Sequence, residues 1–280
     1  MFDIVPWLVQ RMRLIAALFF CIIASAANAQ DVSAWAADKY SAVRLLAGSR
    51  NGAVLLGGIG FKLDPGWKTY WRSPGDSGVP PRFDFSKSEN VEAVNVLWPA
   101  PKKFPDGNGG FSLGYHDQVV VPLRIVTKNA DQPVTLRAHI DYAVCDKLCI
   151  PVDADLELPF VSVASMQDSV LSSALESVPK PASIGDPNPL TIRDVKRIGP
   201  KTVQVNVVAP EGVEAALFVE GPTPDWALPI PKLAKREPHN VQRFTFDLDG
   251  VPPGVSPNGA ALKFTLSGGN RTYEFNTNLN

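Results

Sequence analysis

Two cysteines, Cys145 and Cys149, lie near the middle of the 280-residue sequence with three residues between them. Thiols this close in sequence support three kinds of chemistry. They form a structural disulfide, they exchange a disulfide with another protein, or they bind a soft metal ion such as Cu(I). The third cysteine, Cys21, lies in an N-terminal segment that we expect to be removed. The compartment of the protein and the strands around the pair decide among the three.

The N-terminal segment has the pattern of a secretory signal peptide. Two arginines precede an apolar run over residues 14–23, and small residues follow up to Ala29. The run is shorter than the roughly 20 residues of a membrane-spanning helix, so we expect no stable membrane insertion. We expect residues 1–29 to be the signal peptide and the periplasm to be the location, and an internal start at Met12 would give a more typical signal.

Composition gives no sign of nucleic-acid binding and indicates the class of fold. Removal of the signal segment leaves 25 basic and 27 acidic side chains, so the charge gives no reason to expect a nucleic-acid partner. The chain has 26 Pro and 21 Gly, and its apolar residues fall in short runs. This composition predicts a fold built mostly of β-strands.

Apolar runs separated by Gly, Pro, Asn and Asp predict two sets of strands without alternating helices. The first set covers residues 41–48, 53–63, 91–98, 118–127, 134–145 and 150–160. The second set covers residues 190–199, 202–210, 214–221, 242–250, 261–269 and 272–278. We therefore expect an all-β protein with two sandwich-like units.

An amphipathic helix over residues 165–178 and a Pro-rich stretch over residues 179–189 separate the two sets. This composition shift marks the boundary between domains. We expect a first domain at residues 30–165, a helix and linker at residues 166–189, and a second β-sandwich-like domain at residues 190–280.

The two strands that flank the cysteines alternate between apolar and polar residues. Even positions are apolar, from Val134 to Val144 and from Ile150 to Phe160. Successive side chains of a strand point to opposite faces, so the even positions should face the core. Both cysteines have odd numbers. With residues 146–148 as the turn, the sequence predicts a hairpin whose end carries both sulfur atoms side by side, on the face away from the core.

A structural disulfide is common in exported proteins, but this loop is short. Closing about five residues stabilises a fold by roughly 2 kcal/mol in the chain-entropy model, against about 4.7 for 100 residues. A short, exposed ring is the type of disulfide that exchanges readily, so we favour exchange. Lys147 beside the pair favours a thiolate and Asp146 opposes it, so the sequence leaves open which sulfur is attacked.

Three stretches resemble the N-terminal periplasmic domain of the DsbD family of thiol:disulfide interchange proteins. They are CDKLCIP from Cys145, GYHDQVVVPLRI from Gly114, and LDPGWKTYWRSPGDSGVPPRFDF from Leu63. The likeness is greatest to relatives known as suppressor-of-copper-sensitivity protein B. It covers roughly residues 35–160 and, more loosely, the second unit. The resemblance implies an immunoglobulin-like β-sandwich for the first unit.

Carried over by position, Cys145 and Cys149 match the catalytic redox pair of the family. The best-known members separate these cysteines by more residues. Trp67 and Tyr70 match aromatic positions that line the family's active site. Ordinary packing in the sandwich core is the alternative for each of the two rings.

The segment at residues 102–115 matches a cap loop that shields the disulfide in the family. Asn108 occupies the position where an aromatic residue is expected. The resemblance therefore leaves Phe104 or Phe111 as the lid over the active site, with looser shielding than in the family.

The resemblance implies a protein-disulfide reductase component that needs no cofactor. Its cysteine pair would receive electrons from a membrane transporter of the DsbD or CcdA type and pass them to periplasmic thioredoxin-like proteins. Full-length family members fuse this region to a membrane domain and a thioredoxin-like domain. The 280 residues contain neither, so we expect both partners to be separate polypeptides.

Two other classes of function stay open. Cys145 and Cys149 with His139, and also His116, offer soft ligands for Cu(I) in a copper-tolerance protein, although three histidines in the chain are few. A non-catalytic β-sandwich module would use the cysteine pair as a structural disulfide. The redox potential of the pair is the observation that best separates these classes from disulfide exchange.

Overall fold

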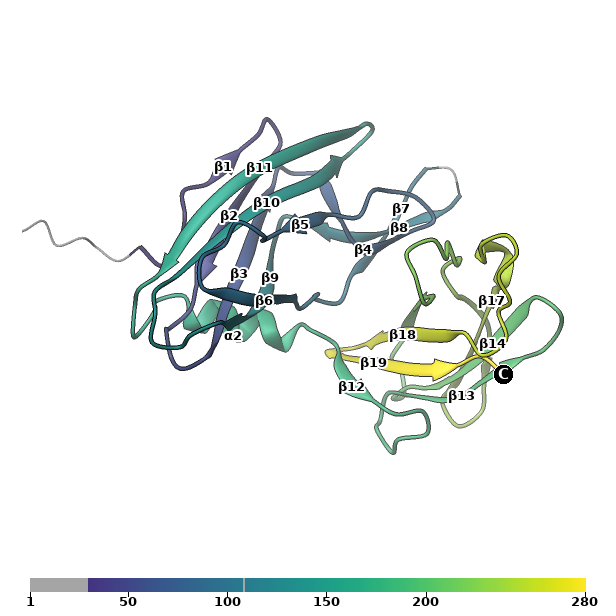
Figure 1. The fold of residues 1–280 in the computed structure, drawn as a ribbon. Coiled ribbons are helices and arrows are strands. Elements are labelled where there is room, and N and C mark those ends of the chain that lie inside the picture. Colours follow the sequence, from purple (N-terminus) through teal and green to yellow (C-terminus); the bar gives the residue numbers. More distant parts are fainter. Residues whose placement is uncertain (1–29, 108) are drawn as a thin grey trace, which may run out of the picture. The chain divides into compact units, whose positions relative to one another are not determined.

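The computed structural model describes residues 30–107 and 109–280, so the predicted signal peptide lies outside the described residues (Figure 1). The chain divides into two units, Met1–Gln30 and Asp31–Asn280, and the elements below belong to the second. The prediction of an all-β fold is confirmed, because strands dominate the described residues. Within the described part of the chain, no helix is long and apolar enough to cross a membrane.

The first half of the described chain forms a β-sandwich of two sheets. One sheet has the order β1 (Ala36–Ala37), β2 (Ser41–Ala47), β3 (Val54–Leu63), β9 (Gln118–Thr127) and β6 (Val91–Val96). The other has the order β11 (Cys149–Phe160), β10 (Val134–Cys145), β4 (Lys68–Gly75), β8 (Phe111–His116) and β7 (Lys102–Pro105), and β5 (Arg82–Asp84) also pairs with β10. The sequence did not predict β4, β7 and β8 as strands, yet they complete the sheet that carries both cysteines.

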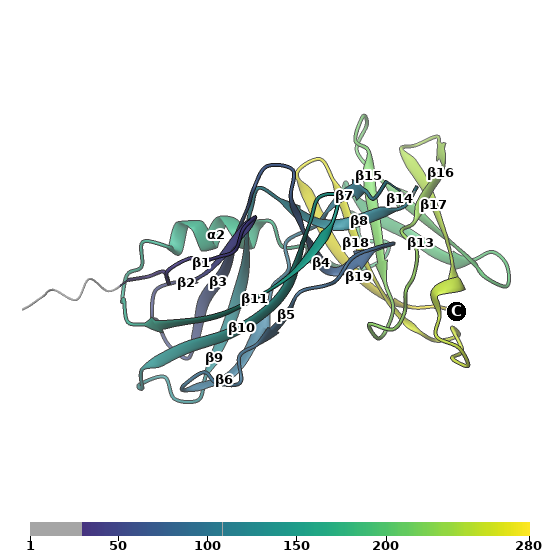
Figure 2. The same ribbon diagram turned by 90° about the horizontal axis from the view of Figure 1, so that it is seen from above.

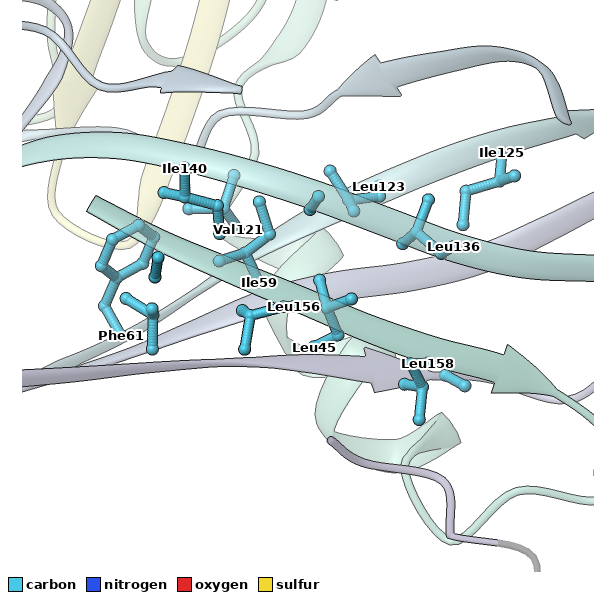
Figure 3. Close-up of a cluster of buried hydrophobic side chains, with 14 of the residues drawn as sticks. Leu45, Ile59, Phe61, Val121, Leu123, Ile125, Leu136, Ile140, Leu156 and Leu158 are labelled. Carbon is cyan, nitrogen blue, oxygen red and sulfur yellow. The ribbon is translucent and has the colours of Figure 1, made fainter. Parts of the chain in front are cut away.

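Apolar side chains from both sheets fill the space between them. Figure 3 shows Leu45, Ile59 and Leu123 from one sheet facing Leu136, Ile140 and Leu156 from the other. All of these except Leu156 are at most 1 % exposed. Burial of each such side chain contributes about 1.5–3 kcal/mol, so this core holds the two sheets in fixed positions.

The long hairpin of β10 and β11 runs beside this core (Figures 1 and 2). Its antiparallel register is continuous from the pair Val134 and Phe160 to the pair Cys145 and Cys149. The even residues of β10 are buried throughout, as the alternation predicted. Because no bulge interrupts the register, the odd residues keep the opposite face from end to end.

Helix α2 (Asp168–Glu176) packs against the first sandwich at residues where the sequence predicted a helix. Its buried residue Leu171 lies where a side chain at Gly58 of β3 would collide with it. Asp168 accepts a hydrogen bond from the backbone N–H of Ser49 at 2.8 Å. The helix therefore covers one sheet of the first sandwich.

The second half of the chain forms another sandwich of two four-stranded sheets. One sheet has the order β12 (Lys180–Ala182), β19 (Arg271–Asn278), β18 (Ala261–Gly268) and β15 (Ala215–Glu220). The other has the order β13 (Thr191–Arg197), β14 (Thr202–Val208), β17 (Val241–Asp247) and β16 (Lys232–Glu237), and a short 3-10 helix, Leu248–Gly250, follows β17. Strand β12 lies in the segment expected to be a linker and pairs in parallel with β19.

Candidate functional site

The two cysteines form a disulfide at the end of the β10–β11 hairpin. They pair directly across the ladder, and Asp146, Lys147 and Leu148 form the connecting turn, as the sequence predicted. Their Cα atoms lie 4.2 Å apart. Leu148, next to Cys149, is 75 % exposed, so the turn presents an apolar side chain to solvent beside the disulfide.

The two sulfur-bearing residues differ in exposure, which the sequence did not predict. Cys149 is exposed, whereas Cys145 is only 2 % exposed. Cys145 does lie away from the main core, but it forms a separate small cluster with Tyr70 and Ala143. The face away from the main core is therefore open to solvent at only one of the two cysteines, because Tyr70 packs against the other.

Tyr70 of β4 contacts both sulfur atoms through its hydroxyl group. The hydroxyl donates a hydrogen bond to Cys145 Sγ at 2.8 Å and lies 3.3 Å from Cys149 Sγ. Burial raises the pKa of Tyr70 above its ordinary value, so the phenol keeps its proton at neutral pH. A protonated hydroxyl at this distance is ready to donate to a thiolate on either sulfur.

The position of Tyr70 depends on close approaches of the backbone. The Thr69 hydroxyl donates to the carbonyl oxygen of Ala143 at 2.9 Å, which ties β4 to β10. On the other side of β4, a Cβ atom at Gly114 would lie 1.9 Å from the Thr69 carbonyl oxygen. A side chain at Gly114 would therefore push β8 away from β4. Only glycine allows this spacing.

A second glycine packs against the ring of Tyr70. Gly78 has a φ of 124°, a region that disfavours other residues, and a Cβ atom there would lie 2.2 Å from Tyr70 Cε1. The backbone at Gly78 thus packs closely against the ring and helps to bury it. Both glycines lie in stretches that resemble the family, but the sequence did not predict their contacts with Tyr70 and Thr69.

A positively charged side chain lies beside the disulfide on the neighbouring strand. Lys68 of β4 pairs directly with Cys145, and His116 of β8 pairs with Lys68. Residues paired across a ladder share a face, so Cys149, Cys145, Lys68 and His116 form one row across the sheet. The sequence singled out Lys147 as the cation near the pair and missed Lys68, which is brought close only by strand pairing.

Trp67, the other aromatic residue that was predicted to line the site, contacts the core of the first sandwich. Its ring stacks on Tyr40 with centroids 3.9 Å apart, and it packs against the core of the first sandwich. Trp67 immediately precedes Lys68, so it anchors the start of β4. A direct role for Trp67 in lining the active site stays a prediction.

The two candidate lid residues lie on β7 and β8. Phe104 contacts the ring of His116 edge-on at 5.5 Å, and the Lys68 ammonium lies 5.8 Å from the Phe104 ring. Phe111 lies under the Lys103 ammonium at 4.2 Å and packs against Trp71 and its neighbours. Phe104 thus contacts Lys68 and His116, which lie in the same row of the sheet as the cysteines. Shielding of the disulfide by either ring stays a prediction.

The histidines do not gather around the cysteines. His139 lies six residues before Cys145 on β10, which corresponds to about 20 Å at roughly 3.3 Å per residue. Its Nδ1 atom contacts Asp155 at 3.0 Å. His116 is nearer to the pair but contacts Asp117. Among residues 30–107 and 109–280, no group of three or more His, Cys, Asp or Glu side chains is arranged to hold a metal ion.

A comparison with known families found a match within the first sandwich. Residues 40–160 match the family model for the N-terminal region of the thiol:disulfide interchange protein DsbD. The match includes both cysteines and strand β4. A comparison with curated proteins found no match.

A solved structure has the same fold. The N-terminal periplasmic domain of ScsB from Proteus mirabilis matches with a TM-score of 0.71 and 22 % identity, over 89 % of this chain and 98 % of that chain. The fold of the first sandwich is therefore the immunoglobulin-like sandwich that the resemblance implied. The yeast GGA1 GAE domain covers 45 % of this chain and 98 % of its own, with 8 % identity and a TM-score of 0.26, too low to carry an argument.

Proposed function

We propose, from the premise that residues 40–160 form an N-terminal domain of the DsbD family, that this protein carries electrons by exchange of the Cys145–Cys149 disulfide. The difference between the two sulfurs carries this proposal. Cys149 is exposed at the end of a hairpin, and Cys145 is buried under a hydrogen-bond donor. A purely structural disulfide requires neither an exposed sulfur nor a hydrogen-bond donor on the other sulfur.

The asymmetry supports distinct roles for the two cysteines. A partner's thiolate must approach the attacked sulfur from solvent, and the exposure of Cys149 favours that residue. The sulfur that leaves becomes a thiolate. Tyr70 donates to Cys145, so the charge on this leaving sulfur is stabilised as it forms. We therefore assign Cys149 as the attacked sulfur and Cys145 as the leaving and resolving sulfur.

Reduction of the pair then proceeds in two steps. A thiolate of an upstream dithiol protein attacks Cys149, a bond forms between the two proteins, and the Cys145–Cys149 bond breaks with Cys145 leaving as a thiolate. The second thiolate of the upstream protein attacks its own bonded sulfur, and Cys149 leaves. The upstream protein ends as a disulfide. The pair gains two electrons and, after protonation, two protons.

Delivery of the electrons follows the reverse order. The Cys149 thiolate attacks the disulfide of a downstream protein and forms a mixed disulfide. Cys145 then attacks Cys149, which restores the Cys145–Cys149 bond and releases the downstream protein with two thiols. The exposed Leu148 beside Cys149 supports an apolar contact with such partners during the exchange.

We further propose that both partners are separate proteins and that the exchange takes place in the periplasm. The upstream partner would be a membrane transporter of the DsbD or CcdA type, and the downstream partners would be thioredoxin-like. The predicted signal peptide supports this location, because it directs export, and disulfides form and persist outside the cytoplasm.

Trapping of the mixed disulfide tests the proposal. Cys145→Ser removes the resolving sulfur, so Cys149 should remain bonded to a partner in its native host after acid quenching and alkylation. Non-reducing gels should show an adduct that disappears on reduction. Cys149→Ser and the double variant are the matched controls and should run as monomers. Monomers for both single variants, with a wild-type pair that is always oxidised, would leave a structural disulfide as the better account.

A further inference from the structure

Strand β4 leaves its sheet immediately after Tyr70. Tyr70 pairs with Gly114 of β8, and the next pair joins Gly75 to Ser112. Between these pairs β4 advances by five residues while β8 advances by two. The segment after Tyr70 is therefore a bulge whose backbone is free of the regular ladder, and other contacts must hold it.

Trp71, the first residue of the bulge, is buried in a core of its own. Its side chain is 0 % exposed and lies outside the core of the first sandwich. The ring packs against Phe218 of β15, with centroids 6.1 Å apart, and Ile230 belongs to the same cluster. Both of these partners come from the second half of the chain. The second sandwich thus supplies part of the apolar environment of Trp71, together with Leu113 and Tyr115 of β8.

Arg72, the next residue, binds two carboxylates of the second sandwich. Its guanidinium makes a two-point contact with Glu220, through Nε at 2.9 Å and Nη2 at 2.8 Å. Nη2 also contacts Glu274 of β19 at 2.6 Å. The three side chains are only 18–23 % exposed, so water screens the interaction less than at an open surface. Arg72 is therefore tied to two strands of the second sandwich.

We infer that Arg72 is a positioning residue for the cysteine pair, through which the second sandwich holds the Tyr70 hydroxyl against Cys145. This inference rests on the proposed function for its purpose. Its physical content is independent of that function. The ion pair between Arg72 and Glu220 controls the environment of the Cys145 sulfur on strand β10.

The mechanism follows from the order of residues on β4. Strand β10 holds β4 through Lys68 and Thr69, before Tyr70. After Tyr70 the ladder with β8 is interrupted, so Trp71 and Arg72 provide the second anchor. A hydrogen bond weakens steeply when donor and acceptor move apart. Release of the second anchor lets Tyr70 shift, and the Cys145 thiolate loses its donor.

The test is the pKa of the Cys145 thiol in the mature chain with Cys149→Ser, where Cys145 is the single thiol. Thiolate absorbance near 240 nm reports the titration. Arg72→Gln should raise this pKa and lower the thiolate fraction at neutral pH by about tenfold to 100-fold, the size expected for loss of a hydrogen bond to a charged acceptor. Arg72→Lys keeps the charge, so its Cys145 pKa should lie between the values for Arg72 and Arg72→Gln.

Two controls separate positioning from a general loss of stability. Arg137→Gln removes an arginine that also contacts two carboxylates, Glu89 and Glu157, and should leave the thiol pKa unchanged. In a Tyr70→Phe background, Arg72→Gln should have no further effect, because the hydroxyl is already absent. If Arg72→Gln does not fold, Glu220→Gln serves as the same test from the other side of the contact.

Two outcomes would overturn the inference. The first is a folded Arg72→Gln protein with an unchanged pKa of Cys145. The second is a shift that persists in full when Tyr70 is Phe. Because the measurement uses one protein without partners, a positive result alongside a failed mixed-disulfide trap would reject the proposed function and keep the positioning role.

Discussion

The hydroxyl of Tyr70 lies 2.8 Å from Cys145 Sγ, although the two residues are 75 positions apart in the sequence. The same hydroxyl lies 3.3 Å from Cys149 Sγ, so one polar group contacts both atoms of the disulfide. Tyr70 thereby buries one sulfur and leaves the other exposed. The chemistry proposed for the pair depends on this difference.

Replacement of Tyr70 by Phe tests the donor. Tyr70→Phe removes the hydroxyl and keeps most of the ring, so the Cys145 thiolate loses its hydrogen bond. We expect exchange with a small dithiol to slow by about tenfold to 100-fold, since a hydrogen bond to a charged sulfur contributes roughly 1.5–3 kcal/mol. Stopped-flow measurement of reduction gives the rate. Tyr142→Phe is the matched control, because its hydroxyl is bonded to Ser41 in the main core. Equal rates for all three proteins would contradict the assigned role.

The redox potential of the pair separates exchange from a structural disulfide. Structural disulfides have potentials below about −300 mV, and exchange proteins have higher values. We expect the mature protein to equilibrate reversibly with glutathione or dithiothreitol buffers at a potential above that limit. Mass spectrometry after alkylation measures the oxidised fraction. A lower potential, or a disulfide that does not equilibrate with the buffer, would favour a structural role.

Lys68 should influence the thiolate more than Lys147 does. Lys68 pairs with Cys145 across the ladder and is half-buried, whereas Lys147 lies in the exposed turn. A nearby positive charge favours the thiolate, so Lys68→Gln should raise the pKa of the Cys145 thiol. Lys147→Gln should change it less, because salt screens an exposed charge. The same absorbance titration compares the two. A larger effect of Lys147→Gln would show that the turn, and not the paired strand, sets the electrostatics.

Copper binding should be weak and independent of His139. His139 lies about 20 Å from Cys145 along the strand, too far to share a metal ion with it. The hydrogen bond to Asp155 raises the pKa of His139, which favours the protonated form that does not bind metals. Titration of the reduced protein with Cu(I) against a competing chelator should give the same affinity for wild type and His139→Ala. A tight complex lost in both His139→Ala and Cys145→Ser would restore the copper-binding hypothesis.

The facing of the hairpin could be predicted from the sequence because it is a local property. Alternation from Val134 to Val144 places the even residues in the core, and the structure keeps that register up to Cys145. The strands around Tyr70 and Phe111 were missed. Pro74 and Gly75 interrupt the alternation of β4, which is bulged, and β7 and β8 are short strands separated by a glycine-rich turn.

The sequence alone determined the all-β class, the hairpin tip with its two cysteines, and the face on which the cysteines lie. These three features follow from patterns within about a dozen residues. Alternation with a period of two sets which face a side chain takes, and turn residues set where a strand ends. Only the tertiary structure decided that Cys145 is buried and Cys149 exposed. That difference arises from Tyr70, on a strand far away in the sequence, and from the glycines that let the backbone approach it. Contacts between distant segments depend on how the sheets close, and no local pattern encodes that closure.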